Sequence, residues 1–398
     1  MDILTAIGSF FASVGFFFSS LFGGVTTAPD VVSAPVDPQS EVASVQSATS
    51  TTGQKTYSDS ELLAMARDAF PSGVVPLGDY KYVTVSAKKG YIYLCNAHKD
   101  NPGSMVNGPW ISSSTWNFKQ KVTVDGAVVW KNASFTQTLS GAYRTLTGND
   151  LPVGQTTGVF PVAVSDDAHA YDPNPNTISV QSIKQNLPAH PQYTKTPYCM
   201  GGEVGIMTNG VALFNGFDAG LRDAPAHEVQ DSNDGHPQGT GEYHYHSLPA
   251  FLHEATVSTV IGFAYDGFPI TGPVVEKGKY LTTSNLDECH GLTSEVVLDG
   301  KMTVTYHYVM TYDFPYSVSC FRGKPVTTGP SSGAPAGGAG GGTQAIMPSS
   351  GMTPPQEAIT ACSKKTQGAS CSFTGGRGET VSGTCDTPPG SSLACVPK

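Results

Sequence analysis

The sequence predicts a mainly β protein, with an antiparallel, strand-rich, sandwich-like domain built from hairpins. Glycine (45), proline (29) and aromatic residues (10%) are abundant among the 398 residues, whereas only 14% are charged. This balance is typical of short strands and turns rather than of long amphipathic helices. Asn-Gly and Asp-Gly pairs, which tolerate the positive φ of tight hairpins, recur at residues 125–126, 209–210, 215–216, 266–267 and 299–300.

The charge balance argues against one class of partner. The net charge is -10, and the chain has no run of lysine or arginine. A nucleic-acid-binding protein needs a basic patch for the phosphates, so we expect no nucleic-acid partner.

Residues 1–24 carry an uncharged apolar run of about 20 residues, near the length that a membrane span requires. The segment has neither the basic start nor the A-x-A-like cleavage site of a cleavable signal peptide. We therefore favour an uncleaved membrane anchor over a cleaved signal, and either over an amphipathic surface helix. Each places the remainder in the cell envelope or outside the cell. Residues 25–56 have the composition of a disordered linker.

The ordered part begins with residues 57–143, predicted to be the β-rich N-terminal part of the core. Ser58 as N-cap, with Glu61 three residues later, forms a capping box for a short helix over 61–70 that Pro71 ends. Residues 80–95 place a glycine-containing turn between aromatic runs, and Asp125-Gly126 predicts a hairpin within residues 121–130.

The C-terminal part divides into two pieces. Residues 327–357 are rich in Gly, Pro and Ser and predict a flexible linker. Residues 358–398 hold four of the eight cysteines, in a piece with too little core to fold without cross-links. An even number of cysteines is typical of disulfides in an exported protein. We expect a small disulfide-rich accessory module.

The stretch GEYHYHSLP (residues 241–249) is the strongest candidate site. On a strand His244 and His246 point to one face and the two tyrosines to the other. The loop after His236 can fold that residue back beside His244, and Asp234 lies close by in sequence. Neutral imidazoles are good ligands for copper, zinc and iron. Imidazoles hydrogen-bonded to carboxylates without a metal, or a histidine acting as general base, are the alternatives.

A partial copy of the motif follows at residues 305–309. If Asp299-Gly300 is a two-residue hairpin turn, Leu292 lies opposite His307, and His290 becomes a diagonal neighbour of His307 on one face. Glu288 falls on the same face one step further along. We interpret these residues as a possible second side of one metal site.

At these residues the sequence resembles the YHYH domain family. The resemblance extends over residues 144–323 in ordered blocks: 146–164, 172–178, 210–217, 234–249, 261–273, 286–291 and 306–323. It implies a YHYH domain over 144–326 and an exported protein, and it implies no particular activity. The positions that match are His236, His244, His246, Asp266, Asp287, Glu288, Cys289, His307, Cys320 and Arg322.

The chain departs from the family pattern in its second half. The second tetrapeptide ends in Val309 instead of histidine, and His290 stands where relatives often have asparagine. We therefore expect His290 to replace the lost ligand. The matching blocks also imply a disulfide between Cys289 and Cys320. Cys95 then pairs with Cys199, and Cys362, Cys371, Cys385 and Cys395 pair among themselves.

The sequence thus predicts an exported or envelope-anchored protein whose YHYH domain binds a transition metal, copper or zinc. The predicted ligands or ligand-supporting residues are His236, His244, His246, His290, His307, Asp234, Asp266 and Glu288. A surface or adhesion protein that binds a cell-surface partner or a polysaccharide is the first alternative. An extracellular metal-dependent hydrolase or oxidase is the second.

Overall fold

The computed structural model describes residues 54–68, 70–100, 103–104, 106–326, 356–374, 380–386 and 393–397. The predicted segment 1–24 and most of the two predicted linkers lie outside these residues. Within them the predicted strand-rich, mainly antiparallel fold is confirmed, and the helices are few and short. No helix in the described ranges is long and apolar enough to cross a membrane.

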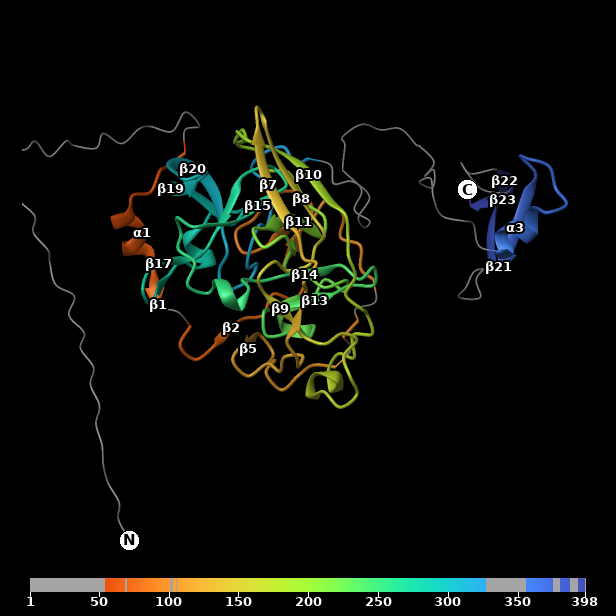
Figure 1. Ribbon diagram of the computed structural model, residues 1–398, viewed down its shortest axis with the longest axis horizontal. Coiled ribbons are helices and arrows are strands. Elements are labelled where there is room, and N and C mark those ends of the chain that lie inside the picture. The colour runs from red at the N-terminus through yellow and green to blue at the C-terminus, as the bar shows by residue number, and fades with distance from the viewer. Residues whose placement is uncertain are drawn as a thin grey trace, which may run out of the picture. The chain divides into compact units, whose positions relative to one another are not determined.

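An eight-stranded mixed sheet forms the centre of the main body (Figure 1). Neighbouring strands are antiparallel except at β12–β14 and β16–β20, which are parallel. In order across the sheet, the strands are β13 (Gly235–Pro237), β14 (Tyr243–Tyr245), β12 (Ala212–Phe214), β11 (Glu203–Met207), β15 (Val260–Ala264), β16 (Pro269–Thr271), β20 (Lys301–Val309) and β19 (Gly291–Leu298).

Three of the predicted hairpin turns are present in this sheet. Asp299 and Gly300, with φ of 51° and 75°, join β19 to β20, and Leu292 lies opposite His307 as predicted. Gly210 and Gly267 also have positive φ in the turns between β11 and β12 and between β15 and β16.

The hairpin predicted within residues 121–130 is absent. After Asp125-Gly126 the chain does not return along itself, because Val128 of β6 (Val128–Val129) pairs with Thr157 of β9 (Thr156–Thr157). The predicted glycine-containing turn within 80–95 is present, with Gly90 at a φ of 76°. The aromatic runs beside it pair in parallel as β3 (Tyr82–Val83) and β4 (Ile92–Tyr93), so they do not form a hairpin. Long-range partners decide the pairing in this part of the chain.

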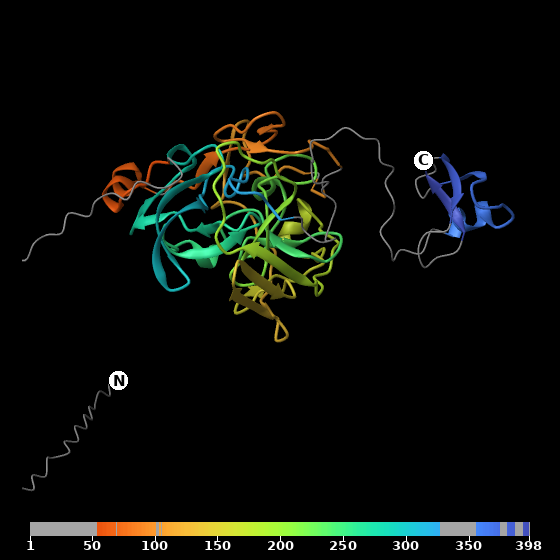
Figure 2. The ribbon, with the colours of Figure 1, turned by 90° about the horizontal axis from the view of Figure 1, so that it is seen from above.

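Smaller sheets surround the central sheet (Figure 2). One has the order β10 (Ile183–Pro188), β8 (Tyr143–Gly148), β7 (Phe135–Ser140); another β1 (Arg67–Asp68), β18 (Lys279–Tyr280), β17 (Val274–Glu276); and β2 (Val74–Pro76) pairs with β5 (Thr115–Asn117). The helical elements here are α1 (Asp59–Met65), α2 (Ala224–His227) and 3-10 turns at Asp167–Ala170, Ala250–Leu252 and Thr283–Asn285.

The predicted capping box at Ser58 and Glu61 is present, but the helix is shorter than predicted. It ends at Met65 because Arg67 and Asp68 pair with β18. Pro71 therefore does not terminate it.

Residues on both sides of position 143 share one hydrophobic core. Its buried members include Ile92, Trp110 and Trp116 from the N-terminal part and Tyr245 and Phe321 from the later part. The described residues before position 144 therefore complete the core around the central sheet.

Both predicted cysteine pairs are confirmed, and the four C-terminal cysteines pair among themselves as expected. Cys289 pairs with Cys320, and Cys95 with Cys199. The C-terminal module contains α3 (Gln356–Cys362), β21 (Ser370–Thr374), β22 (Thr380–Asp386) and β23 (Ala394–Pro397). Its cysteines pair among themselves, as Cys362–Cys385 and Cys371–Cys395, and fill its small core.

Candidate metal centre

The strands β13 and β14 bring three histidines together. His236 lies directly opposite His244 in the antiparallel pair, as the loop after His236 predicted. The loop closes through a backbone hydrogen bond from Gln238 to Glu242, and Gly241 adopts a φ of 82°. His236, His244 and His246 are 3–4% exposed, and each offers a nitrogen within 4.8 Å of the others.

The tyrosines of the motif occupy the opposite face of β14, as predicted. The Tyr243 hydroxyl donates to Asp231 Oδ2 at 2.8 Å, and Asn209 Nδ2 donates to the Tyr245 hydroxyl at 3.0 Å. Both tyrosines are fully buried. The alternation in YHYH thus separates a hydrogen-bonded aromatic core from an imidazole cluster.

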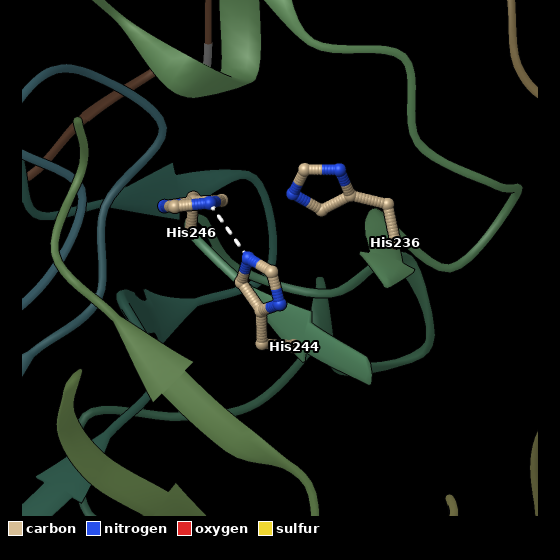
Figure 3. Close-up of side chains that lie close together, drawn as sticks. All are labelled: His236, His244 and His246. Carbon is tan, nitrogen blue, oxygen red and sulfur yellow. Dashed lines mark hydrogen bonds between the residues drawn. The ribbon is translucent and has the colours of Figure 1, made fainter. Parts of the chain in front are cut away.

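Backbone carbonyls fix the tautomers of two histidines. His246 Nδ1 lies 2.5 Å from the Asn215 carbonyl oxygen, and His244 Nδ1 lies 3.2 Å from that of Glu242. Because a carbonyl only accepts, each Nδ1 carries the proton and each Nε2 presents a lone pair. These two Nε2 atoms are 3.1 Å apart (Figure 3). Two lone pairs at this distance repel each other unless a cation lies between them.

A proton is a poor candidate for that cation. Burial lowers the pKa of His236 and of His244 well below 6.5 and lowers the pKa of His246 to about 4. All three rings are therefore neutral at pH 7, which is the form that binds metals. A metal ion satisfies the lone pairs without protonating a ring.

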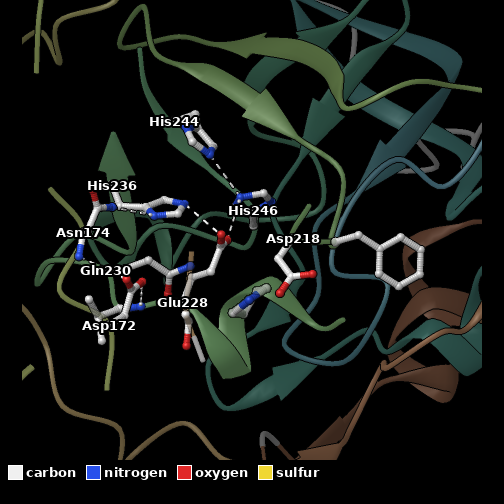
Figure 4. A network of polar contacts seen from close by, with 12 residues as sticks. Asp172, Asn174, Asp218, Glu228, Gln230, His236, His244 and His246 are labelled. Carbon is white, nitrogen blue, oxygen red and sulfur yellow. Dashed lines mark hydrogen bonds and ion pairs between the residues drawn. The ribbon is translucent and has the colours of Figure 1, made fainter. Parts of the chain in front are cut away.

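Glu228 completes the cluster (Figure 4). Its Oε2 lies 3.5 Å from His236 Nε2 and 3.5 Å from His246 Nε2. The buried Glu228 Oε2 and His236 Nε2 have no hydrogen-bond partner. Burial, with smaller contributions from Asp218 and Asp172, raises the pKa of the Glu228 carboxyl well above its usual value.

The spacing of these donors fits a tetrahedral ion. Zinc bonds to imidazole nitrogen and carboxylate oxygen are about 2.0–2.2 Å long, so neighbouring donors of a tetrahedral site lie about 3.3–3.5 Å apart. Three of the six donor separations, given above as 3.1, 3.5 and 3.5 Å, are close to that value, and the histidine nitrogens all lie within 4.8 Å of one another. The residues present therefore fit an ion held by three imidazoles and one carboxylate.

The segment that carries Glu228 is anchored from the N-terminal part of the chain. Lys121 Nζ donates to the carbonyls of Pro225 and Glu228 at 2.5 and 2.6 Å and to Gln230 Oε1 at 2.6 Å. Trp110 Nε1 donates to the Ala226 carbonyl at 2.8 Å. These bonds hold the carbonyls at the end of α2 and fix where the Glu228 side chain starts.

Asn174 supports His236 from behind. Its amide nitrogen donates to the Pro237 carbonyl at 3.1 Å and lies 3.5 Å from His236 Nδ1. The contact with the ring is at the long limit of a hydrogen bond, so it constrains the tautomer of His236 less than the carbonyls constrain His244 and His246.

The cluster lies in the wall of a cavity of about 480 Å³. His236, His244, His246 and Glu228 all line this cavity, together with Asp172 and Asp218. A volume of this size is in the range of small-molecule sites.

The structure does not bring His290 and His307 to this cluster. The His307 nitrogens contact the hydroxyls of Thr271 at 2.9 Å and Ser294 at 2.8 Å, and His290 Nε2 contacts the Thr311 hydroxyl at 2.9 Å. The predicted hairpin register is present, but neither ring belongs to a three-residue ligand group among the described residues. His290 and His307 therefore do not form a second side of the metal site.

The three predicted carboxylates also lie apart from the cluster. Asp266 accepts from the Tyr308 hydroxyl at 2.6 Å and from the Gly323 amide at 2.8 Å. Glu288 pairs with Arg322 at 2.6 Å, and Asp234 lies beside a second, smaller cavity. Glu228, which the sequence reasoning missed, supplies the carboxylate instead. In the sequence, only the position of Glu228, eight residues before His236, suggests that it could join the cluster. That position does not reveal that its side chain is buried.

Residues 184–279 match the family model described as YHYH protein. The matched segment contains His236, His244, His246 and Glu228, and it ends before His290 and His307. No curated protein and no solved structure matches the chain.

Proposed function

The chain contains a YHYH domain over residues 184–279, and we propose that this domain binds one transition-metal ion, copper or zinc. His236, His244 and His246 would hold the ion through Nε2, and Glu228 would supply the fourth donor. Three neutral imidazoles and a carboxylate are donors that suit these borderline metals. A bound ion would act as a Lewis acid or, if it is copper, as an electron carrier.

The observation that carries the proposal is the pair of Nε2 lone pairs 3.1 Å apart, each fixed by a carbonyl at the opposite nitrogen. A metal-free cluster of hydrogen-bonded histidines would place a donor against an acceptor. Here His244 and His246 face each other as two acceptors, and the unpartnered Glu228 oxygen points at the same place. A metal cation among these atoms would satisfy all of them.

We also infer that the chain is exported, to the cell envelope or outside the cell. Four disulfides and no free cysteine among the described residues support this, because disulfides persist in oxidising compartments. The apolar segment 1–24 is our proposed leader or anchor.

Metal analysis of full-length protein, produced without a histidine tag in an oxidising compartment, tests the metal proposal. We expect close to one equivalent of copper or zinc per chain, and a higher melting temperature than that of the chelator-treated protein. His246→Ala should lose the metal. His253→Ala is the matched control, because this half-exposed histidine lies outside the ligand group and should keep it. Wild-type protein that takes up neither metal, and gains no stability from either, would overturn the proposal.

A further inference from the structure

The proposed metal donors all face the cavity beside the cluster. The four donors come from β13, from β14 and the residue after it, and from the residue after α2. All four side chains line the same cavity. An ion held by them would therefore border the cavity.

The wall of the cavity offers an incoming molecule several acidic side chains, most of them engaged with other groups of the protein. None of the described residues that line it is lysine or arginine. Asp218 is neutralised by Arg222, with 2.6 Å between Oδ2 and Nη2, and Asp100 lies 3.1 Å from His98. Asp172 accepts from the backbone amides of Asn174 and Val229.

The remaining wall combines apolar surface with amide groups. The apolar side chains are Leu94, Met200, Phe214, Phe217 and Leu221, and the amides are Asn96, Asn176 and Gln238. Apart from the histidines of the cluster, an anion finds no basic side chain here other than the exposed His98. An uncharged molecule with an apolar body finds surface to cover and amides to hydrogen-bond.

We propose that the cavity is a ligand site that brings an uncharged small organic molecule to the metal, where its oxygen donor becomes a fifth ligand. The centre is then reactive rather than purely structural, since a catalytic zinc ion can expand from four to five ligands, whereas a structural ion stays four-coordinate. This inference rests on the proposed metal site. It goes beyond it by assigning the cavity and the class of molecule that enters.

Cobalt(II) in place of the native metal gives the test a spectroscopic readout. The probe is acetohydroxamic acid, which enters uncharged at pH 7 and coordinates through oxygen as the hydroxamate, releasing its proton to the buffer. We expect its addition to shift the visible absorption bands of the cobalt protein saturably, with cobalt still bound after gel filtration. Sulfate, an anion, should cause no shift at the same concentration.

Two substitutions that fill the cavity provide the matched comparison. Gly239 lines the cavity, and a Cβ added there meets nothing within 4 Å, so the side chain of Gly239→Trp starts in open space. Ala219 lines the cavity from another segment and is exposed, so Ala219→Trp fills the cavity from there. Each should weaken hydroxamate binding at least tenfold while leaving the affinity for cobalt within about threefold. Ala64→Trp, on the exposed face of α1 and absent from the cavity wall, should behave as wild type.

The outcomes separate the two proposals. If wild-type protein binds no cobalt, zinc or copper, the metal site itself fails. If cobalt binds but hydroxamate leaves its spectrum unchanged, or shifts it equally in both tryptophan variants, the metal site stands and the ligand cavity is overturned. A stronger response to sulfate than to hydroxamate would overturn the assignment to uncharged molecules.

Discussion

Metal binding at pH 6 should release about one proton, and that proton should come from Glu228. Ligands must lose their protons before they bind, so the number released reports their protonation in the metal-free protein. Isothermal titration calorimetry in buffers of different protonation enthalpy measures this number directly. The perturbation is the addition of zinc to chelator-treated protein at a fixed pH.

The structure sets the number of protons that we expect to be released. Three solvent-exposed imidazoles with a pKa of about 6.5 would each be about three-quarters protonated at pH 6, and together would release about two protons. Here burial lowers the pKa of His246 to about 4 and those of His236 and His244 well below 6.5, so these rings release almost none. Burial raises the pKa of the Glu228 carboxyl, which therefore holds a proton that the metal displaces.

The comparison with Glu228→Gln makes the result decisive. The amide has no proton to release at this pH, so proton release should fall from about one to about zero while zinc still binds, more weakly. Release of two or more protons by the wild-type protein would refute the reasoning from burial. Unchanged release in the glutamine variant would refute the assignment to Glu228.

Three further predictions concern residues around the site and in the core. Lys121→Met should weaken metal binding about 10-fold to 100-fold in equilibrium dialysis, because it removes the bonds that hold the Glu228 segment, whereas Lys121→Arg should restore part of the affinity. Asp299→Asn should lower the free energy of unfolding by about 3 kcal/mol in urea titrations, because it leaves the buried Arg144 guanidinium without its bidentate partner, and a loss below 1 kcal/mol would contradict this. The folded pKa of His307 is about 3, below its unfolded value of about 6.5, so its stabilising contribution is present above pH 6.5 and is lost as pH falls. Between pH 7 and 5 the free energy of unfolding of the metal-free wild type should therefore fall by about 2 kcal/mol more than that of His307→Gln. Equal losses in the two proteins would refute this.

The local parts of the structure could be predicted from the sequence. The register of β19 and β20 follows from one Asp-Gly turn, and the facing of the YHYH side chains follows from strand alternation. His236 joins the cluster because the loop to His244 is short. In each case the determining residues are neighbours along the chain.

The remainder depends on contacts between distant segments. Val128 pairs with Thr157, and no turn signal indicates that partner. His307 has the residue type of a ligand, but hydroxyls on neighbouring strands occupy both its nitrogens. Glu228 becomes a candidate ligand only because Lys121, more than 100 positions earlier, clamps its segment beside the histidines. Residue type and local spacing therefore identified part of the cluster but not its carboxylate.

The order of strands in the central sheet limits how small a folding unit the matched segment can belong to. Residues 184–279 end after β16, but the next strand across the sheet, β20, is contributed by a hairpin that follows them. A gene fragment that encoded the matched segment alone would expose the backbone of β16 as an unpaired edge, a template for aggregation. The smallest piece of the chain that keeps β16 paired is therefore larger than the matched segment, because it must include the flanking hairpin of β19 and β20.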